Sequence, residues 1–461
     1  MEMNAPAIVN SAPRPLTISR AELLTALSRA LDMTEGQPAG HALRCCWIGL
    51  AIGREYGLPQ TTLDSLYYAI ILKDLGCSSN AARICQLYLT DDLKFKRDSK
   101  TMRDSLPHAL SFVLSHTGLQ VGPAQRFRAM FDVVRNGHSI VQELIETRCE
   151  RGERIARDMH FSDDVAVGVR DLDEHWDGGG RPARLRGDAI SMLARIALIA
   201  QVADVFHTAA GPDAACAEVI LRSGTWFDPS LAAAFGRATR ANGFWQMLRS
   251  SDLEPVLWDL APDRQADIVD DAYLDEIATG FAQVVDAKSP FTGGHSLRVS
   301  RYADTIARHM GWDEERRRWL RRAGLLHDIG KLGVSNQVLD KPGKLNETEW
   351  RAIRAHPGDG ETILARVAAF GEISAMAGAH HERLDGRGYP RGLVAAQIGD
   401  ETRILTAADV FDALTAERPY RGPMSGHDAI AIMARDIGTA FDPRCVAALE
   451  QVVPQKTTVD E

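Results

Sequence analysis

The sequence predicts an all-α protein, and three observations favour that class. Apolar residues recur at the three- and four-residue spacing of a helix face, as in Leu274, Ile277 and Phe281. Helix-ending signals follow such stretches, including the Gly-Leu-Pro sequence at 57–59 and Gly311. Segments with the alternation of a strand are few and short. We therefore expect helices packed through apolar stripes rather than a sheet.

Several helices can be placed along the chain. Residues 1–15 are rich in Ala, Pro and Asn and are expected to form a flexible lead-in. Thr17 or Ser19 is placed to cap the first helix, because a side-chain oxygen there can accept from the first free amides. The helices predicted after it lie over 21–31, from His41 to 57–59, over 66–75, over 273–285, and from His295 to Gly311.

Length and composition indicate a globular protein of two or three domains. The chain has 461 residues, of which 45% are hydrophobic and 25% charged, and this length exceeds one ordinary core. Its formal net charge is −9 at pH 7, from 53 basic and 62 acidic residues. That charge argues against a protein that coats a nucleic-acid polymer. It is compatible with a small anionic substrate, whose site needs only local positive charge.

The cysteines and the apolar segments predict a cytoplasmic protein. Seven cysteines are scattered along the chain without a C-x-x-C pair, a pattern that fits a reduced compartment better than a disulfide framework. Residues 1–15 lack the basic region and apolar core of a secretion signal. No run of about 18 apolar residues is present, so we expect no membrane span.

The stretch from Gly324 to Pro390 carries the strongest chemical signal. Four histidines and several carboxylates lie there within apolar, helix-forming sequence. Histidine nitrogen and carboxylate oxygen are the ligands of hydrolytic transition-metal sites. One histidine upstream and one aspartate downstream extend the set. The seven candidate ligands are His295, His327, Asp328, His356, His380, His381 and Asp409.

Each candidate ligand also has an ordinary structural explanation. His295 begins an apolar helix stripe and fits a core histidine bonded to a carbonyl. His327 and Asp328 fit the end of a helix, although neighbouring helical side chains about 100° apart can also address one cluster from two directions. His356, before Pro357 at the start of a segment with two glycines, fits a surface loop. His380 follows a predicted helix over 373–379 and in isolation also fits a surface loop. Only the ordered set favours a metal centre over these alternatives.

The sequence also contains an internal duplication, because six stretches of the first half align in order with later ones. They are 41–44 with 295–298, 72–76 with 326–330, 151–155 with 359–363, 173–182 with 381–390, 203–206 with 408–411, and 227–229 with 441–443. The copies are unequal. The first has Lys73 for His327, Cys77 for Lys331, Arg148 for His356, Leu172 for His380, Asp173 for His381 and Arg181 for Tyr389. We expect it to keep only His41, Asp74 and, in place of Asp409, Asp204.

In order, the motifs H…HD(I)GK…HP…HHE(R)xDGxGYP…ADVFDALT resemble those of the HD-GYP family, a branch of the HD metal-dependent phosphohydrolases, from about Asp286 to Phe441. The resemblance implies tandem all-helical HD-type domains, the second an HD-GYP domain. The expected parts are a lead-in at 1–15, a degenerate HD-like domain at 16–262 with a helical insertion at about 91–145, a catalytic HD-GYP domain at 263–455 and a tail at 456–461. The family hydrolyses cyclic di-GMP, a bacterial second messenger.

The resemblance further implies two divalent metal ions, iron, manganese or similar. It assigns His295, His327, Asp328 and Asp409 to one ion and His356, His380 and His381 to the other, with Asp328 bridging. Two ions about 3.5–4 Å apart can bind a phosphate oxygen and lower the pKa of a bridging water. Asp328 and Lys331 are therefore the predicted catalytic residues, with Lys331 neutralising charge on the phosphate; its alternative is a solvated surface lysine. Phe291 stands where some relatives have a glutamate for a third ion, so we predict two.

The predicted substrate contacts cluster in two segments near the ligands. The glycine-rich loop at 385–392 can bring amides and arginines to a phosphate and an aromatic ring to a base, although it also fits a tight structural turn. The second segment follows the last candidate ligand, where arginine forks suit phosphate. The candidate contacts are Lys331, Arg387, Tyr389, Arg391, Asp412, Arg418, Tyr420 and Arg421.

Three functions are compatible with these patterns. The first is a phosphodiesterase that hydrolyses cyclic di-GMP to pGpG and/or GMP, with the degenerate half regulating or dimerising it. The second is a phosphohydrolase for another nucleotide or phosphate ester, because a fold does not determine a substrate. The third is a cyclic-dinucleotide-binding signalling protein without catalysis. The candidate partners are the cyclic dinucleotide, a second copy of the chain, and a signalling protein that contacts the 385–392 loop or the first half.

Overall fold

The computed structural model of this chain describes residues 18–102, 106–262, 269–417 and 421–452. Within these ranges the chain is helical, and its extended segments form only isolated bridges, such as Asp385 with Val394. The all-α prediction is confirmed. The lead-in at 1–15 and the tail at 456–461 lie outside the described residues, as does part of the predicted junction between the halves.

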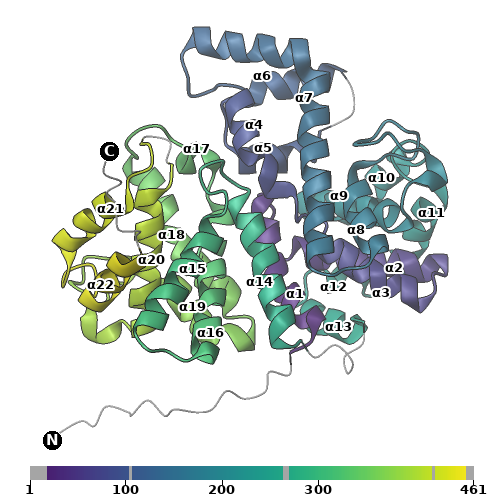
Figure 1. The fold of residues 1–461 in the computed structure, drawn as a ribbon. Helices are drawn as coiled ribbons and strands as arrows, with labels where there is room; N and C mark the ends of the chain where they lie inside the picture. Colours follow the sequence, from purple (N-terminus) through teal and green to yellow (C-terminus); the bar gives the residue numbers. More distant parts are fainter. Residues whose placement is uncertain (1–17, 103–105, 263–268, 418–420, 453–461) are drawn as a thin grey trace, which may run out of the picture.

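The first half consists of thirteen described α-helices and three 3₁₀ turns (Figure 1). They are α1 (Arg20–Thr34), α2 (His41–Tyr56), α3 (Gln60–Ile71), η1 (Cys77–Asn80), α4 (Ala81–Tyr88), α5 (Asp92–Ser99), α6 (Leu106–His116), α7 (Pro123–Asp158), α8 (Asp163–Arg170), η2 (Asp171–Asp173), η3 (Gly187–Ala189), α9 (Met192–Ala210), α10 (Pro212–Arg222), α11 (Pro229–Ala238), α12 (Phe244–Met247) and α13 (Leu253–Leu260). Ser19 caps α1, accepting from the Glu22 amide while the Glu22 carboxylate accepts from the Ser19 amide.

The second half repeats the helical pattern in shorter form. Its elements are α14 (Asp271–Asp286), α15 (His295–His309), α16 (Glu314–Leu326), η4 (Ile329–Gly333), α17 (Asn336–Leu339), α18 (Glu347–Leu364), η5 (Ala368–Phe370), α19 (Gly371–Ala379), η6 (Ala395–Gln397), α20 (Asp400–Thr415), α21 (Gly426–Met433), η7 (Ala434–Asp436) and α22 (Pro443–Val452). The prediction that His356 begins a segment is wrong, because His356 lies inside α18 and Pro357 is accommodated within that helix.

The two halves share one apolar core. Buried residues of both halves form a single cluster, and α1 and α14 lie between the two bodies in Figure 1. The contact is close at Gly333, where a Cβ would lie 2.3 Å from the Met33 Cε atom of α1. A side chain at position 333 would therefore displace the Met33 methyl group, which packs against the 3₁₀ turn that follows the predicted ligands His327 and Asp328.

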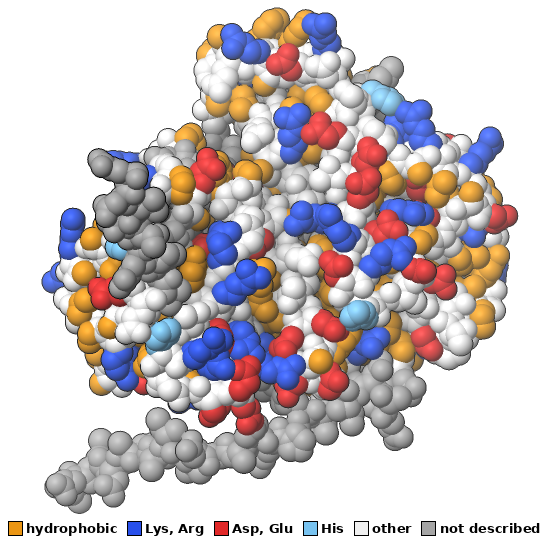
Figure 2. All heavy atoms as spheres, viewed as in Figure 1, with side chains coloured by type: hydrophobic (Ala, Val, Ile, Leu, Met, Phe, Trp, Pro, Cys, Tyr) orange, Lys and Arg blue, Asp and Glu red, His pale blue; other side chains and the backbone are white. Residues whose placement is uncertain are grey.

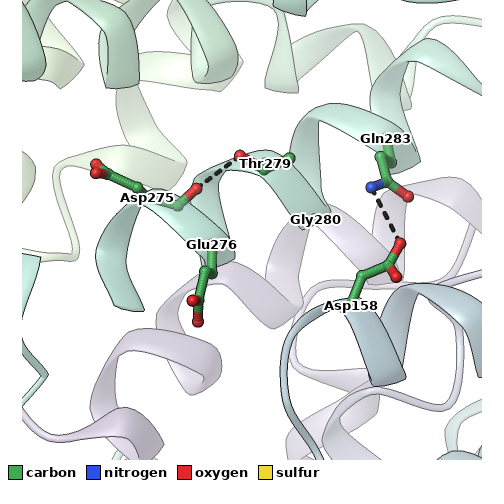
Figure 3. Close-up of a pocket in the computed structure, with 6 residues that line it drawn as sticks. All are labelled: Asp158, Asp275, Glu276, Thr279, Gly280 and Gln283. Atoms are coloured by element: carbon green, nitrogen blue, oxygen red, sulfur yellow. Dashed lines mark hydrogen bonds between the residues drawn. The ribbon is translucent and has the colours of Figure 1, made fainter. Parts of the chain in front are cut away.

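A second contact joins the end of α7 to α14. Figure 3 shows a surface pocket lined there by side chains of both helices, with Gln283 Nε2 donating to Asp158 Oδ2 at 3.3 Å. None of the predicted ligands lines this pocket. It marks the junction of the halves rather than the chemistry.

The insertion predicted at about 91–145 forms α5, α6 and the first part of α7. In Figure 1, α6 and the first part of α7 stand away from the rest of the chain. A small separate core joins α7 to α4 and is made by Ile84, Tyr88, Val133, Ile140 and Leu144. The surface position of the insertion does not extend to α5, because the Asp92 side chain is fully buried against the second half.

One described helix is long and apolar enough to span a membrane by length and composition. It is α9, and 72% of its apolar window is buried inside the protein, so it serves as a core helix of the first half. On the face shown in Figure 2, acidic and basic side chains are interspersed over both halves.

Candidate metal centre

Three of the predicted histidine ligands are oriented by helix carbonyls that lack their usual amide partner. His327 Nδ1 bonds Gly324 O at 2.8 Å, and His380 Nδ1 bonds Ala377 O at 2.7 Å. Both carbonyls lie in the last turn of a helix, where carbonyl oxygens are left without an intrahelical amide partner. The predicted helix ends at these two histidines therefore position their rings.

His356 reaches the same arrangement through a proline. Pro357 has no N–H, so the carbonyl of Ile353 loses its partner inside α18. His356 Nδ1 takes that place and bonds Ile353 O at 2.6 Å. The His-Pro pair thus orients an imidazole ring from the middle of a helix.

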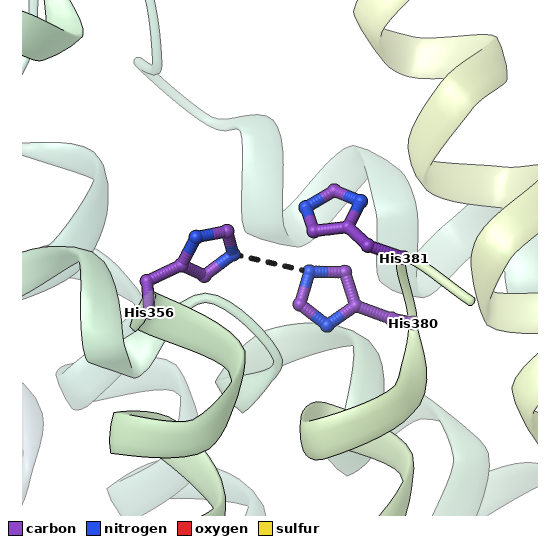
Figure 4. A group of neighbouring side chains, drawn as sticks. All are labelled: His356, His380 and His381. Atoms are coloured by element: carbon purple, nitrogen blue, oxygen red, sulfur yellow. Dashed lines mark hydrogen bonds between the residues drawn. The ribbon is translucent and has the colours of Figure 1, made fainter. Parts of the chain in front are cut away.

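With Nδ1 used in this way, the Nε2 atoms point inward. A neutral imidazole carries one proton, so a ring that donates from Nδ1 presents a lone pair at Nε2. His356 Nε2 and His380 Nε2 face each other at 3.3 Å, with His381 beside them (Figure 4). Two facing lone pairs repel unless a cation lies between them, and the ligand atoms of these three histidines are close enough together to hold one.

Asp328 lies between two groups of ligands. Its Oδ2 atom is 3.3 Å from His295 Nε2 and 3.4 Å from His327 Nε2. Its Oδ1 atom is 3.3 Å from His356 Nε2 and 3.6 Å from His380 Nε2. Each carboxylate oxygen therefore addresses a different pair of histidines, which is the geometry of a bridging ligand.

Asp409 completes the first group and approaches the second. Its Oδ1 atom lies 3.4 Å from His295 Nε2 and 3.9 Å from His327 Nε2, and its Oδ2 atom lies 3.9 Å from His381 Nδ1. The structure thus brings all seven predicted ligands together. It forms two sets of donor atoms with Asp328 between them.

The donor atoms are buried and lack protein partners, as a cation site requires. His295 Nε2, His327 Nε2 and Asp328 Oδ1 are buried without a hydrogen-bond partner among the described residues, and such orphaned groups are costly unless something else satisfies them. Burial lowers the pKa of His327 to about 4, which keeps its lone pair available. Burial opposes ionisation of Asp328, but His327 and Lys331 hold its pKa well below the usual range. Burial also lowers the pKa of His356, and neutral imidazoles such as these beside an ionised carboxylate fit divalent transition-metal ions.

His295 is oriented by a carboxylate instead of a carbonyl. Its Nδ1 atom lies 2.7 Å from Asp412 Oδ2, and Arg298 Nε donates to Asp412 Oδ1 at 2.6 Å. Burial opposes charge on His295, but the neighbouring carboxylates of Asp328 and Asp412 raise its pKa to about 9. Asp412 is itself fully buried. The prediction that Asp412 contacts substrate does not fit this placement, since both its oxygens are occupied by His295 and Arg298.

Lys331 borders the bridging carboxylate. Its ammonium group is ion-paired with Asp328 Oδ2, and its side chain is partly exposed. A charge placed between the ligands and solvent can meet an incoming phosphate, which is the role that the sequence predicted for Lys331.

The remaining predicted substrate contacts differ in whether their side chains are already bonded within the protein. Arg391 Nη1 is paired with Glu361 at 2.7 Å, and Arg421 donates to the carbonyls of Leu414 and Ala413 at the end of α20. Both guanidinium groups are therefore committed to the protein. Tyr389 packs its ring 4.8 Å from that of His381. Arg387 is exposed, while Arg418 and Tyr420 lie outside the described residues.

Sequence reasoning missed the role of Glu382. Its carboxylate is buried and accepts from the amides of Arg391 and Gly392 at one oxygen and from that of Leu393 at the other. Glu382 thus holds the glycine-rich loop against the histidines. The HHE motif could have indicated this role, because an acidic residue directly after two candidate ligands either binds the metal as well or anchors a neighbouring loop.

Two positions before α15 bear on the number of ions. Phe291 supplies no oxygen where some relatives have glutamate, as noted from the sequence. Ser289, where many have an acidic residue, donates to Asp340 Oδ1 at 2.5 Å and so fastens the loop to α17. The expectation of two ions stays a prediction.

The first half contains a matching but altered centre. A Cβ added at Gly76 would clash with the Arg148 carbonyl, and one added at Gly330 would clash with the His356 carbonyl. The Glu174 carboxylate accepts from the amides of Ala183 and Leu185. The Glu382 carboxylate accepts in the same way from the amides of Arg391 and Leu393. These paired contacts bear out the duplication. Lys73 is ion-paired with Asp74, and Arg148 with Asp173. Two fixed positive charges therefore stand where the second copy has imidazoles.

The predicted match of Asp204 with Asp409 is wrong. Asp204 lies 2.7 Å from His41 Nδ1 and accepts from Arg44 Nε at 2.7 Å, which repeats the contacts of Asp412 with His295 and Arg298. By the same helix register, Gln201 occupies the place of Asp409. The first copy therefore keeps only His41 and Asp74 of the seven candidate ligands, fewer than the sequence suggested.

Comparison with known proteins finds a matching family model, similar sequences and a similar crystal structure. A family model described as an HD domain matches residues 128–231 and 280–445. The chain is 50% identical over 437 residues to the 3′3′-cGAMP-specific phosphodiesterase 3 of Vibrio cholerae, covering 95% of each chain. It is 38% identical over 194 residues to the cyclic di-GMP phosphodiesterase response regulator RpfG of Xanthomonas campestris, covering 40% of this chain and 51% of that relative. A crystal structure of a cyclic GMP-AMP specific phosphodiesterase from V. cholerae matches with a TM-score of 0.64 and 45% identity, over 94% of this chain and 97% of that one.

Proposed function

The chain belongs to the HD-GYP branch of the HD domain family and is a metal-dependent phosphodiesterase, and we propose that its substrate is a cyclic dinucleotide opened at a centre of two divalent ions. The observation that carries this proposal is Asp328, whose two oxygens face different pairs of histidines at 3.3–3.6 Å. A single ion held by one pair of histidines would leave the other pair and its carboxylate oxygen without a cation.

The proposed assignment of ligands follows the two donor sets. His295, His327 and Asp409 would hold one ion with Asp328 Oδ2, and His356, His380 and His381 would hold the other with Asp328 Oδ1. When bound, such ions supply positive charge to a phosphodiester and lower the pKa of a water molecule between them. Iron and manganese suit these nitrogen and oxygen donors.

The residues of the chain have separate tasks around that centre. Asp412 holds the His295 proton on Nδ1, so that Nε2 stays directed inward. Lys331 neutralises charge on the phosphate as it enters, exchanging its ion pair with Asp328 for one with substrate. Arg387 is exposed on the glycine-rich loop and is the arginine of that loop without a committed ion pair among the described residues. Glu382 keeps the loop in place.

We propose 3′3′-cGAMP as the first candidate substrate, ahead of the cyclic di-GMP favoured from sequence motifs. The relative that matches along nearly the whole chain, including the altered first half, is named for 3′3′-cGAMP. The Xanthomonas cyclic di-GMP phosphodiesterase matches over less than half of the chain. Only the first of these two relatives also matches the first half of this chain, so we give its substrate more weight than that of the Xanthomonas enzyme.

A substrate panel tests this choice. Purified full-length protein is supplied with Mn²⁺ or Fe²⁺, and kcat/KM is measured for 3′3′-cGAMP, cyclic di-GMP and cyclic di-AMP, with products separated by chromatography. We expect the largest kcat/KM for 3′3′-cGAMP, with a linear dinucleotide appearing first. A larger kcat/KM for cyclic di-GMP would restore the original expectation. Hydrolysis of none of the three would turn the search to other phosphate esters.

The first half is proposed to support the second rather than to catalyse. It shares the apolar core with the second half and places Asp92 and Met33 against the loops that flank the histidines. A homodimer and a signalling partner stay predictions. The proposed location is the cytoplasm, and all seven cysteines are unpaired, as expected in a reduced compartment.

A further inference from the structure

A row of aromatic and cationic side chains leads from the metal centre to the surface. The ring of Tyr389 lies 4.8 Å from that of the candidate ligand His381. On the other side, the Arg354 guanidinium carbon lies 5.5 Å from the Tyr389 ring centroid and 5.5 Å from that of Trp350. The row therefore runs from His381 through Tyr389 and Arg354 to Trp350.

The outer end of this row is open to solvent. Trp350 is 44% exposed, an unusual position for an indole in a soluble protein. It lies on the same helix, α18, that carries His356, one and a half turns towards the N-terminus. Arg354 is also exposed, and it forms no ion pair among the described residues, so its charge is free to meet a ligand.

The duplicated first half provides an internal comparison. In the register that matches Arg148 with His356, the residues in place of Trp350, Arg354 and Tyr389 are Gln142, Glu146 and Arg181. Gln142 still contacts the equivalent loop, because its Nε2 atom donates to Pro182 O at 2.8 Å. The copy that lacks most of the candidate metal ligands thus keeps the local fold but lacks both aromatic rings and the cation between them. A purely structural role for the row would predict its retention in both copies.

We propose that Trp350 and Arg354 form a nucleobase-binding ledge beside the metal centre, on which one purine of the substrate stacks while its phosphate lies at the ions. An indole or guanidinium face stacks on a purine with little dependence on which base it is. The ledge rests on the proposed cyclic-dinucleotide substrate and adds a binding subsite to it. Trp350 and Arg354 contribute to binding, whereas the ligands at 295–409 perform the chemistry.

Substitutions on the ledge test the proposal through KM and kcat separately. Trp350→Ala and Arg354→Ala are compared with the wild type, with Trp350→Phe as the conservative variant and Tyr56→Ala as a matched control. Tyr56 is an exposed aromatic residue of the first half, 40% exposed. We expect Trp350→Ala to raise the KM for 3′3′-cGAMP by about 5- to 150-fold, the range for one lost base–aromatic stack, with kcat largely retained. Trp350→Phe restores most of the affinity, and Tyr56→Ala changes neither constant.

A binding measurement keeps the test independent of turnover. Stacking on an indole quenches its fluorescence, so titration of the metal-loaded protein with 3′3′-cGAMP should quench a signal that Trp350→Phe lacks. An unchanged KM in Trp350→Ala, together with full quenching in Trp350→Phe, overturns the ledge. Quenching that depends on Trp350 without any hydrolysis by the wild type supports the ledge and contradicts the proposed activity. Absence of both quenching and hydrolysis contradicts both proposals.

Discussion

His295 Nδ1 lies 2.7 Å from Asp412 Oδ2, and the corresponding atoms of His41 and Asp204 in the first half are also 2.7 Å apart. The pair survives in the copy that has lost most of the candidate ligands. It therefore belongs to the framework of the fold, and in the second half that framework also aims Nε2 of His295 at the centre.

Asp412→Asn should weaken metal binding without removing a ligand. An amide in place of the carboxylate can no longer hold the His295 proton firmly on Nδ1, and loss of such an outer partner costs about 10- to 100-fold in metal affinity or activity. Metal content by elemental analysis and kcat for 3′3′-cGAMP measure the effect. Asp213→Asn, at an exposed position of α10, is the control. Equal metal affinity in Asp412→Asn and wild type would show that the pair only stabilises the fold.

The two copies should respond differently to the same substitution. In the first, Asp74 is buried beside the Lys73 ammonium, so Asp74→Asn leaves a buried charge unpaired and should destabilise the protein by about 3–5 kcal/mol. In the second, Asp328→Asn should abolish binding of at least one ion, because the carboxylate between the two sets of histidines loses its charge. Urea unfolding and metal content together separate the two results. Loss of metal in Asp74→Asn would mean that the first copy also holds an ion.

The buried pair of Asp92 and Lys288 should couple the halves. The Lys288 ammonium lies 3.3 Å from Asp92, which also accepts from the amide of Asn336 at 2.8 Å. These contacts join α5 of the insertion to the loops before His295 and after Lys331. Asp92→Asn should cost about 3–5 kcal/mol in the free energy of unfolding, because Lys288 is left buried and unpaired.

A double substitution controls that result. In Asp92→Asn with Lys288→Met, neither member of the pair is charged, so part of the lost stability should return. Thermal unfolding of the two single variants and the double variant gives the coupling energy. Strictly additive effects would contradict a direct interaction between the two residues.

Chelation should lower the thermal stability of the wild type. Ions that bind only the folded state stabilise it by about 2.7 kcal/mol for each site filled at 100 times its Kd, so removal of metal with EDTA should lower Tm. The same treatment of a His327→Ala, Asp328→Ala variant should leave its Tm unchanged. An equal drop in both proteins would place the metal-dependent stability outside the second centre.

The seven candidate metal ligands could be predicted from the sequence because they lie in short motifs that follow one another in a fixed order. The helix ends at His327 and His380 followed from their positions after apolar runs. Asp204 was matched wrongly because Ala-Asp-Val-Phe occurs in both halves, and because positions 409 and 412, three residues apart on one helix, both face the centre. Only the hydrogen bond to His41 decides which aspartate is equivalent.

Other parts of the site depend on contacts that sequence patterns do not contain. Asp92 lies far in sequence from Lys288 and Asn336, so its burial between them could not be read from local periodicity. The carbonyl freed by Pro357 was likewise hidden, because a proline normally signals the end of a helix rather than its interior. The sequence also could not show which arginines near the site are bonded within the protein, as Arg391 and Arg421 are.

The most direct test is hydrolysis of 3′3′-cGAMP by full-length protein purified without chelator and supplied with Mn²⁺ or Fe²⁺, beside the His327→Ala, Asp328→Ala variant. We expect about two ions per chain and turnover in the wild type, and loss of both in the folded variant. Turnover that persists in the variant would contradict a catalytic centre built on Asp328.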